Sequence, residues 1–236
     1  MDHPIVSEVA EPLLEAWRAT AMPGVVRSSA LVEDRADSSF AGQFESYLGL
    51  DNEADFLTAV RACWAALWST RALRYMATHG LDPADTAMGL LIQPLVAARV
   101  AGGGLSRTAD GDMIINATRG QGARIAQGEV APDRYVLDRS GRLKESAAGR
   151  KSRGFACIHA RRGLFKMMPG EPCLGDDDIA LLGSLLHRAE EVIGGPAEIE
   201  WALDDTGIKL LQARPLHVGA AQVPDEIWLR HPRLSG

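Results

Sequence analysis

Residues 25–48 read VVRSSALVEDRADSSFAGQFESYL, and they contain a pattern that predicts a phosphate-binding loop. The apolar run from Gly24 to Val26 predicts a short buried strand, which is followed directly by Arg27. A loop of small and hydroxyl-bearing residues around Gly42 comes next. Arginine offers forked, permanently charged donors, and small residues let backbone N–H groups approach phosphate oxygens. From the residue types alone, a polyphosphate site and an ordinary surface loop both remain open.

The spacing of apolar residues predicts the elements around this stretch. The first half is expected to hold a helix over 6–20, an extended segment over 43–50, a long helix over 52–78 and a buried strand over 86–96. Asp51 or Asn52 is expected to cap the long helix, and Gly80 to end it. Trp64 and Trp68 lie on the apolar stripe of that helix, so we expect both in the core.

The second half is expected to hold a flexible turn at 102–104, a strand over 113–117, a hairpin about Ser140-Gly141, a helix over 177–193 and a hairpin over 198–214. The three glycines at 102–104 lack the Lys-Ser/Thr that completes a phosphate-binding P-loop, so we interpret them as a turn. The three aspartates at 176–178 suit a metal, but helix capping explains them more simply. Together these elements predict an α/β (α+β) fold with a mostly antiparallel sheet flanked by helices.

The hairpin over 198–214 carries the most specific candidate site. If residues 205–207 form a three-residue loop with a left-handed Gly207, Glu200 lies opposite Gln212. Arg214 is two residues further on and shares their face of the hairpin. Hard oxygen ligands suit magnesium, and a guanidinium neutralises phosphate charge. The alternative is a solvated hairpin face that carries a Glu–Arg ion pair.

Ordered motifs along most of the chain resemble a known family. They are Arg27-Ser28-Ser29-Ala30, Glu33-Asp34, Ser39 to Gln43, Ile92 to Val96, Gly128 to Tyr135, Ile199-Glu200-Trp201 and Leu211 to Pro215. In this order they resemble the nucleotide-binding domain of phosphoenolpyruvate synthase, pyruvate phosphate dikinase and rifampin phosphotransferase, which is an ATP-grasp module. The resemblance implies a C-terminal-lobe-like ATP-grasp domain over 23–216, after a helical lead-in over 1–22 and before a tail over 217–236.

The resemblance also implies ATP and Mg²⁺ as cofactors and assigns roles to individual residues. It places Glu200 and Gln212 on magnesium and Arg214 on the phosphates. It places Gln93 near the adenine. The residues that it implies along the triphosphate are Arg27, Gly42 and Ser46, and the two arginines, Arg27 and Arg214, are the candidate catalytic residues.

Departures from the family pattern leave the function open. Ala123 replaces a family glutamate, and an aromatic and a hydroxyl residue are missing around 105–107. The family's N-terminal lobe with its lysines, its phosphohistidine domain and its phosphoenolpyruvate barrel are not recognised. We therefore expect an ATP-binding subunit of a split phosphotransferase or ligase, dependent on a partner protein or on homo-oligomerisation. The alternatives are a non-catalytic nucleotide-binding or assembly protein and an inactive relic.

Composition excludes several other classes. The 236 residues are 46% hydrophobic, with a net charge of −6, so a general nucleic-acid-binding role is not expected. No apolar run reaches the length of a membrane span, and no signal peptide is evident. Three widely separated cysteines predict neither a disulfide framework nor a zinc site. We expect a cytoplasmic protein.

Overall fold

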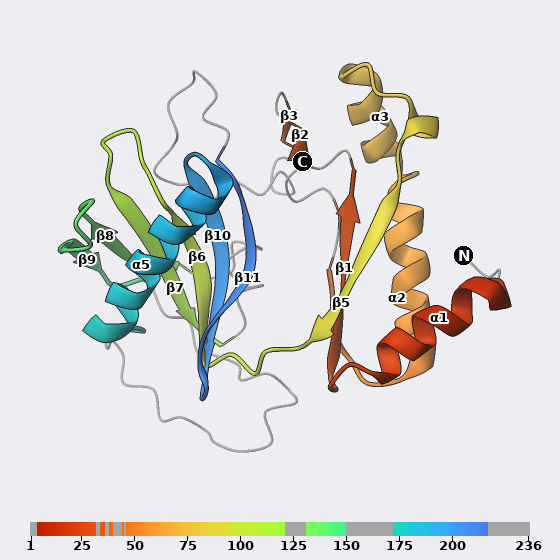
Figure 1. Cartoon of the computed structure of the whole chain (residues 1–236), viewed down its shortest axis with the longest axis horizontal. Coiled ribbons are helices and arrows are strands. Elements are labelled where there is room, and N and C mark those ends of the chain that lie inside the picture. The colour runs from red at the N-terminus through yellow and green to blue at the C-terminus, as the bar shows by residue number, and fades with distance from the viewer. Residues whose placement is uncertain are drawn as a thin grey trace. The chain divides into compact units, whose positions relative to one another are not determined.

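The computed structural model describes residues 4–31, 34–35, 38–39, 44, 46–120, 131–149 and 172–216. The chain forms two compact units, residues 1–95 and 96–236. Every strand pair in the described residues is antiparallel, and helices pack on the sheets (Figure 1). The expected mixed α/β class with mostly antiparallel pairing is confirmed. No described helix is both long enough and apolar enough to cross a membrane.

The first unit is built on a three-stranded sheet in the order β4-β1-β5. Its elements are α1 (Ser7–Arg18), β1 (Gly24–Ala30), β2 (Asp34–Arg35), β3 (Ser38–Ser39), β4 (Ser46–Leu50), α2 (Glu53–Ala66), α3 (Thr70–Thr78), the 3₁₀ turn η1 (Pro83–Asp85) and β5 (Met88–Pro94). The central strand β1 pairs with both neighbours and extends to Ala30, so Arg27 lies within the strand and not after it as expected.

Helices α1 and α2 cover one face of this sheet (Figure 1). Trp17 of α1 stacks on Phe56 of α2 with ring centroids 4.6 Å apart, and Val26 of β1 is fully buried beside them. A Cβ atom on Gly24 would lie 2.3 Å from the Trp17 ring, so only glycine permits this packing. Burial of such aromatic and aliphatic surface is the main force that holds the helices on the sheet.

The single long helix expected over 52–78 is wrong, because the chain forms α2 and α3 there with a break at Leu67 to Ser69. At the break, backbone bonds run to the third preceding residue, a tightening typical of a helix end. The Ser69 side chain then accepts a hydrogen bond from the Ala72 N–H at 3.2 Å and caps a new helix. The break leaves Trp68 58% exposed, so its expected place in the core is also wrong. Asn52 caps α2 as expected, and Gly80, with a φ of +64°, follows α3.

The strand expected over 86–96 is confirmed as β5, but its full burial is not. Within the described residues, β5 pairs with β1 alone, and it lies at one edge of the sheet. Its side chains alternate in exposure, and Leu91 is 48% exposed. An edge strand with one covered face needs only every second residue to be buried.

The second unit is a six-stranded sheet in the order β11-β10-β6-β7-β8-β9. Its elements are β6 (Val100–Leu105), β7 (Met113–Arg119), β8 (Asp133–Leu137), β9 (Leu143–Ala147), α5 (Asp176–Ile193), β10 (Ala197–Asp204) and β11 (Gly207–Pro215). These bounds confirm the expected strand over 113–117, both hairpins and the helix over 177–193. Gly194, with a φ of +81°, ends α5 as a left-handed cap.

Helix α5 crosses one face of this sheet, which we call the inner face (Figure 1). Buried apolar residues of α5 meet alternate residues of the strands. In β10, Ile199 and Trp201 point to this core, with 1% and 0% exposure. Because side chains alternate along a strand, Glu198 and Glu200 lie on the opposite, outer face.

The expected turn at 102–104 is wrong, because the three glycines form the centre of β6 between β10 and β7. A Cβ atom on Gly102 would lie 1.8 Å from the Asn116 carbonyl oxygen and 2.9 Å from the Trp201 ring. The Trp201 indole lies close to the strand and donates from Nε1 to the Gly103 carbonyl oxygen at 3.2 Å. The glycines are therefore a packing requirement of a central strand.

Candidate functional site

The hairpin β10–β11 pairs Glu200 with Gln212, as the sequence predicts. The turn that leads to this register differs from the expected loop. Asp204 pairs with Gly207 across a two-residue turn, so the three-residue loop is wrong. The register instead shifts between Glu200 and Trp201, where Leu211 is an extra residue of β11. This bulge restores the pairing of Glu200 with Gln212, and bulges often lie beside functional sites.

Arg214 and Glu198 form the next cross-strand pair on the same outer face. The Arg214 Nε donates to Glu198 Oε2 at 2.8 Å, and Nη2 lies 2.6 Å from the same oxygen. The Glu198 side chain is 7% exposed and that of Arg214 is 26% exposed. A nearly buried carboxylate thus fixes the orientation of the guanidinium, and the charge-assisted bonds make this fixation strong. The sequence prediction missed Glu198, although the two-residue spacing from Glu200 signals its shared face.

The outer face therefore presents Glu200, Gln212 and Arg214 side by side on two strands. A carboxylate and an amide oxygen are hard ligands of the kind that Mg²⁺ prefers. An arginine oriented by a carboxylate can bind a phosphate oxygen through its remaining donors. The residues fit a magnesium nucleotide chemically.

Three predicted residues of the first unit share one face of its sheet. Arg27 pairs with Ser46 on β4 and with Leu91 on β5, and Gln93 pairs with Val25. Cross-strand partners share a face, as do residues two apart in a strand. Arg27, Ser46 and Gln93 therefore lie together on one face.

This face is the one opposite to the helices. The intervening residues Val26, Tyr47 and Ile92 point to the core with α1 and α2. Leu48 and Leu91 lie among the polar residues and are 45% and 48% exposed within the structure. The face thus combines a cation, a hydroxyl, an amide and apolar side chains, which together suit a nucleotide. Gly42, Ala123 and the first three residues of the Gly128 to Tyr135 motif lie outside the described residues.

The described end of that motif has a structural role. Asp133 is 2% exposed, and its two carboxylate oxygens accept from the Gly149 and Cys173 N–H groups, both at 2.8 Å. The Tyr135 hydroxyl accepts from the Leu174 N–H at 3.3 Å, and burial raises the pKa of Tyr135 to about 12. Through these hydrogen bonds, Asp133 and Tyr135 hold the backbone at Gly149 and at Cys173-Leu174 against β8.

The aspartates at 176–178 act at the start of α5. The Asp178 Oδ2 accepts from the Gly175 N–H at 3.4 Å, and negative charge at a helix N-terminus complements the helix dipole. The described part of the chain holds no group of three or more His, Cys, Asp or Glu residues that could bind a metal. The capping interpretation is therefore supported.

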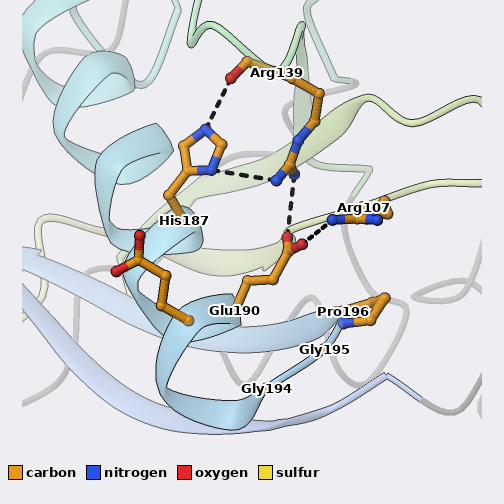
Figure 2. A pocket seen from close by; sticks show the side chains of 8 residues that line it. Arg107, Arg139, His187, Glu190, Gly194, Gly195 and Pro196 are labelled. Atoms are coloured by element: carbon orange, nitrogen blue, oxygen red, sulfur yellow. Dashed lines mark hydrogen bonds and ion pairs between the residues drawn. The ribbon is translucent and has the colours of Figure 1, made fainter.

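A polar depression lies at the other end of α5, and Figure 2 shows the residues that line it. Glu190 forms ion pairs with Arg107 and with Arg139, the latter at 3.1 Å. His187 contacts Arg139 twice, through the guanidinium at 3.3 Å and the carbonyl oxygen at 3.1 Å. Burial alone would raise the pKa of Glu190, but hydrogen bonds from Ser106, Arg107 and Arg139 outweigh it and lower the pKa.

This cluster is a clamp rather than a ligand site. The guanidinium groups of Arg107 and Arg139 already pair with Glu190, so the net positive charge that could attract an anion is reduced. The bonds join α5 to the ends of β6 and β8, since Arg139 also donates to the Ser106 carbonyl oxygen at 2.5 Å. The outer face of the sheet remains the better candidate site.

The antiparallel sheet and the order of the motifs agree with the nucleotide-binding domain that the sequence resembles. The family model of the pyruvate phosphate dikinase AMP/ATP-binding domain matches residues 1–230, and the chain belongs to that family. The expected family is thereby confirmed.

Curated relatives are much longer proteins. The chain is 32% identical over 213 residues to YvkC, an uncharacterized phosphotransferase of Bacillus subtilis (strain 168), with 86% of this chain and 25% of that protein covered. It is 29% identical over 236 residues to the phosphoenolpyruvate synthase of Pyrococcus furiosus, covering 89% and 29%. It is 35% identical over 204 residues to a rifampicin phosphotransferase of Streptomyces sp, covering 81% and 23%. The chain thus spans about a quarter of the length of these relatives.

Proposed function

We propose that the chain binds ATP with Mg²⁺ as one part of a phosphoenolpyruvate synthase-like, ATP-dependent phosphotransferase or ligase. One observation carries this proposal. In a member of an AMP/ATP-binding family, the hairpin pairs Glu200 with Gln212, and Arg214 lies two residues on along the same face. Carboxylate, amide and guanidinium are the groups that a magnesium nucleotide requires.

Each residue has a distinct role in this proposal. Glu200 and Gln212 hold Mg²⁺ through their side-chain oxygens, and the bound ion neutralises phosphate charge. Arg214 contacts the phosphates, and Glu198 fixes the direction of its guanidinium. Because the guanidinium is positioned before the nucleotide arrives, little reorganisation is needed on binding.

We also propose nucleotide contacts for residues of the first unit, described here by itself. Arg27 and Ser46 follow the triphosphate, together with Gly42, and Gln93 lies near the adenine. Their support is the shared face of Arg27, Ser46 and Gln93 in the three-stranded sheet. We assign the ATP-grasp-like domain to 23–216, with a lead-in over 1–22 and a tail over 217–236.

Phosphoryl transfer requires more than the matched region. The relatives are about four times as long as the part they share with this chain, and ATP-grasp catalysis needs two lobes that close over the nucleotide and exclude water. We propose that a partner protein, a second copy or further parts of a longer polypeptide supply the other lobe and the acceptor domain. Activity of the isolated chain is therefore expected to be near background and to rise when these parts are added.

A non-catalytic nucleotide-binding or assembly protein is the second candidate. The observation that favours it is Ala123, which replaces an acidic residue of the family pattern and so removes a charge from the site. In that case nucleotide binding persists, but no pairing with another protein yields turnover.

Calorimetric titration with Mg-ATP tests the binding common to both candidates. We expect a micromolar to millimolar Kd, about −4 to −8 kcal/mol. No heat and no thermal shift at high millimolar Mg-ATP, with the protein folded, would contradict it. An ATPase assay with and without a protein that carries the other lobe then separates the two candidates.

A further inference from the structure

Asn116 is the first polar residue of the central strand β7, after the apolar run Met113 to Ile115. In β7 its neighbours Ile115 and Ala117 are buried in the core beneath α5. Alternation along the strand places Asn116 on the outer face of the sheet, where it is only partly buried. Core packing therefore does not account for the amide.

The outer face connects Asn116 to the candidate site through one cross-strand row. Glu200 pairs with Gln212 on β11 and with Gly103 on β6, and Gly103 pairs in turn with Asn116 on β7. Gly103 has no side chain, so no side chain stands between Glu200 and Asn116 in this row. Only the buried Gly103 backbone thus separates Glu200 from Asn116, which lie two strand spacings apart.

The amide is available for a ligand. Among the described residues, no partner is found that forms a hydrogen bond with the Asn116 side chain. Arg134, the next member of the row on β8, has its Nη1 3.6 Å from Glu145 Oε1 and lies one strand further from Glu200 than Asn116 does. Asn116 is thus the nearer of the two donors to a ligand bound at Glu200.

Distance excludes Asn116 from the metal shared by Glu200 and Gln212. Strand spacing puts the Asn116 backbone about 10 Å from Glu200 and about 14 Å from Gln212. Magnesium–oxygen bonds are about 2.1 Å long, so an ion between Glu200 and Gln212 lies beyond the short Asn116 side chain. A triphosphate that starts on such an ion is long enough to reach it.

We propose that Asn116 is a further ligand-binding residue of this site, whose side-chain amide donates a hydrogen bond to a phosphate oxygen of the nucleotide across Gly103. This inference rests on the proposed function, because it takes the Mg-ATP site on the outer face as given. The acceptor class is a polyphosphate, since phosphate oxygens are acceptors without donors and match an amide N–H₂.

Calorimetric titrations of the full chain with Mg-ATP and with adenosine test this contact. Asn116→Ala is expected to weaken Mg-ATP binding about tenfold, since it removes one hydrogen bond to a charged group. Asn116→Asp, which has the same shape, is expected to weaken it further because a carboxylate repels phosphate. Adenosine binding stays unchanged in both, and so does Mg-ATP binding in Thr118→Ala, the matched control on the same face of β7.

The outcomes separate the contact from the site. Unchanged Mg-ATP affinity in Asn116→Ala, together with a loss in Glu200→Gln, overturns the contact and leaves the proposed function standing. Tighter Mg-ATP binding by Asn116→Asp also overturns it, because a metal ligand would respond in that way. Absence of Mg-ATP binding by the folded wild-type chain overturns the proposed function and the contact with it.

Discussion

The Glu198 carboxylate holds the Arg214 guanidinium through one oxygen, with N–O distances of 2.8 and 2.6 Å. The pair joins β10 to β11 beside the proposed metal ligands, and Glu198 is buried. An arginine held in this way keeps one direction without a ligand. The same ion pair therefore stabilises the hairpin and orients Arg214 toward a ligand.

The first prediction concerns this orientation. Glu198→Gln is expected to weaken Mg-ATP binding, because a neutral amide holds the Arg214 guanidinium less firmly. Arg214→Ala is expected to weaken it more, and adding Glu198→Gln to Arg214→Ala to change little further. Calorimetric titration of the three variants measures this non-additivity. Strictly additive losses would show that Glu198 acts on the nucleotide independently of Arg214.

The second prediction concerns the clamp at the end of α5. Glu190→Gln is expected to lower the free energy of unfolding at pH 7 by about 2 kcal/mol, because charge-assisted bonds to two arginines are weakened. The folded state lowers the pKa of Glu190 below its ordinary value of 4.5. Its contribution is therefore complete above that pH and is lost as the pH falls through the folded-state pKa.

Urea denaturation at several pH values measures this effect. The difference between wild type and Glu190→Gln should be largest near neutral pH and should shrink below about 4.5. Glu191→Gln, an exposed carboxylate one residue further along α5, serves as the control and should change little. A difference that grows in acid would refute the clamp.

The third prediction concerns the glycine strand. Gly102→Ala is expected to destabilise the second unit by more than about 3 kcal/mol, because its Cβ atom would overlap the Asn116 carbonyl oxygen at 1.8 Å. Gly195→Ala is the matched control, since a Cβ atom there meets nothing within 4 Å. Thermal unfolding of both variants should separate them widely. Equal melting temperatures would mean that β6 does not pack as described.

Much of the fold follows from local sequence signals. Apolar periodicity locates α1 and α5, and the glycine and asparagine caps locate several helix ends. Apolar periodicity does not predict the break between α2 and α3, because the apolar stripe continues through it. Its cause is the Ser69 cap, a local hydrogen bond that competes with helix continuation.

The role of 102–104 needed tertiary information. Three glycines usually weaken a strand, and here they are required because the Trp201 ring and a neighbouring carbonyl group approach the backbone closely. Likewise, the pairing of Glu200 with Gln212 is predicted correctly, but from a wrong loop length. The Leu211 bulge compensates for the shorter turn, and nothing in the local sequence marks its position.

The site is predictable where a motif and an alternation pattern coincide. Glu200, Gln212 and Arg214 share a face because strand residues alternate, and the resemblance to the family is the source of the roles proposed for them. The sequence does not predict Glu198 or Asn116 as site residues, because neither belongs to the metal-ligand pattern. The role of Glu198 follows from its ion pair with Arg214, and the role proposed for Asn116 follows from the row that crosses β6.

The fourth prediction concerns the first unit. Arg27→Ala is expected to weaken Mg-ATP binding about tenfold, because it removes a charged contact to the triphosphate. Arg61→Ala, an arginine on α2 whose guanidinium bonds Thr58 of the same helix, is the control and should bind as wild type. Calorimetry on both variants measures the difference. Equal affinities would remove Arg27 from the site.

The most direct test of the magnesium nucleotide site is calorimetric titration of ATP into wild type and Glu200→Gln, each with Mg²⁺ and with EDTA. Wild type should bind more tightly with Mg²⁺ than with EDTA. Glu200→Gln should lose this magnesium dependence and at least tenfold in Mg-ATP affinity, because an anionic ligand of the ion is removed, while Glu191→Gln should keep both. Glu200→Gln that binds Mg-ATP with the wild-type affinity and the wild-type magnesium dependence would contradict the account.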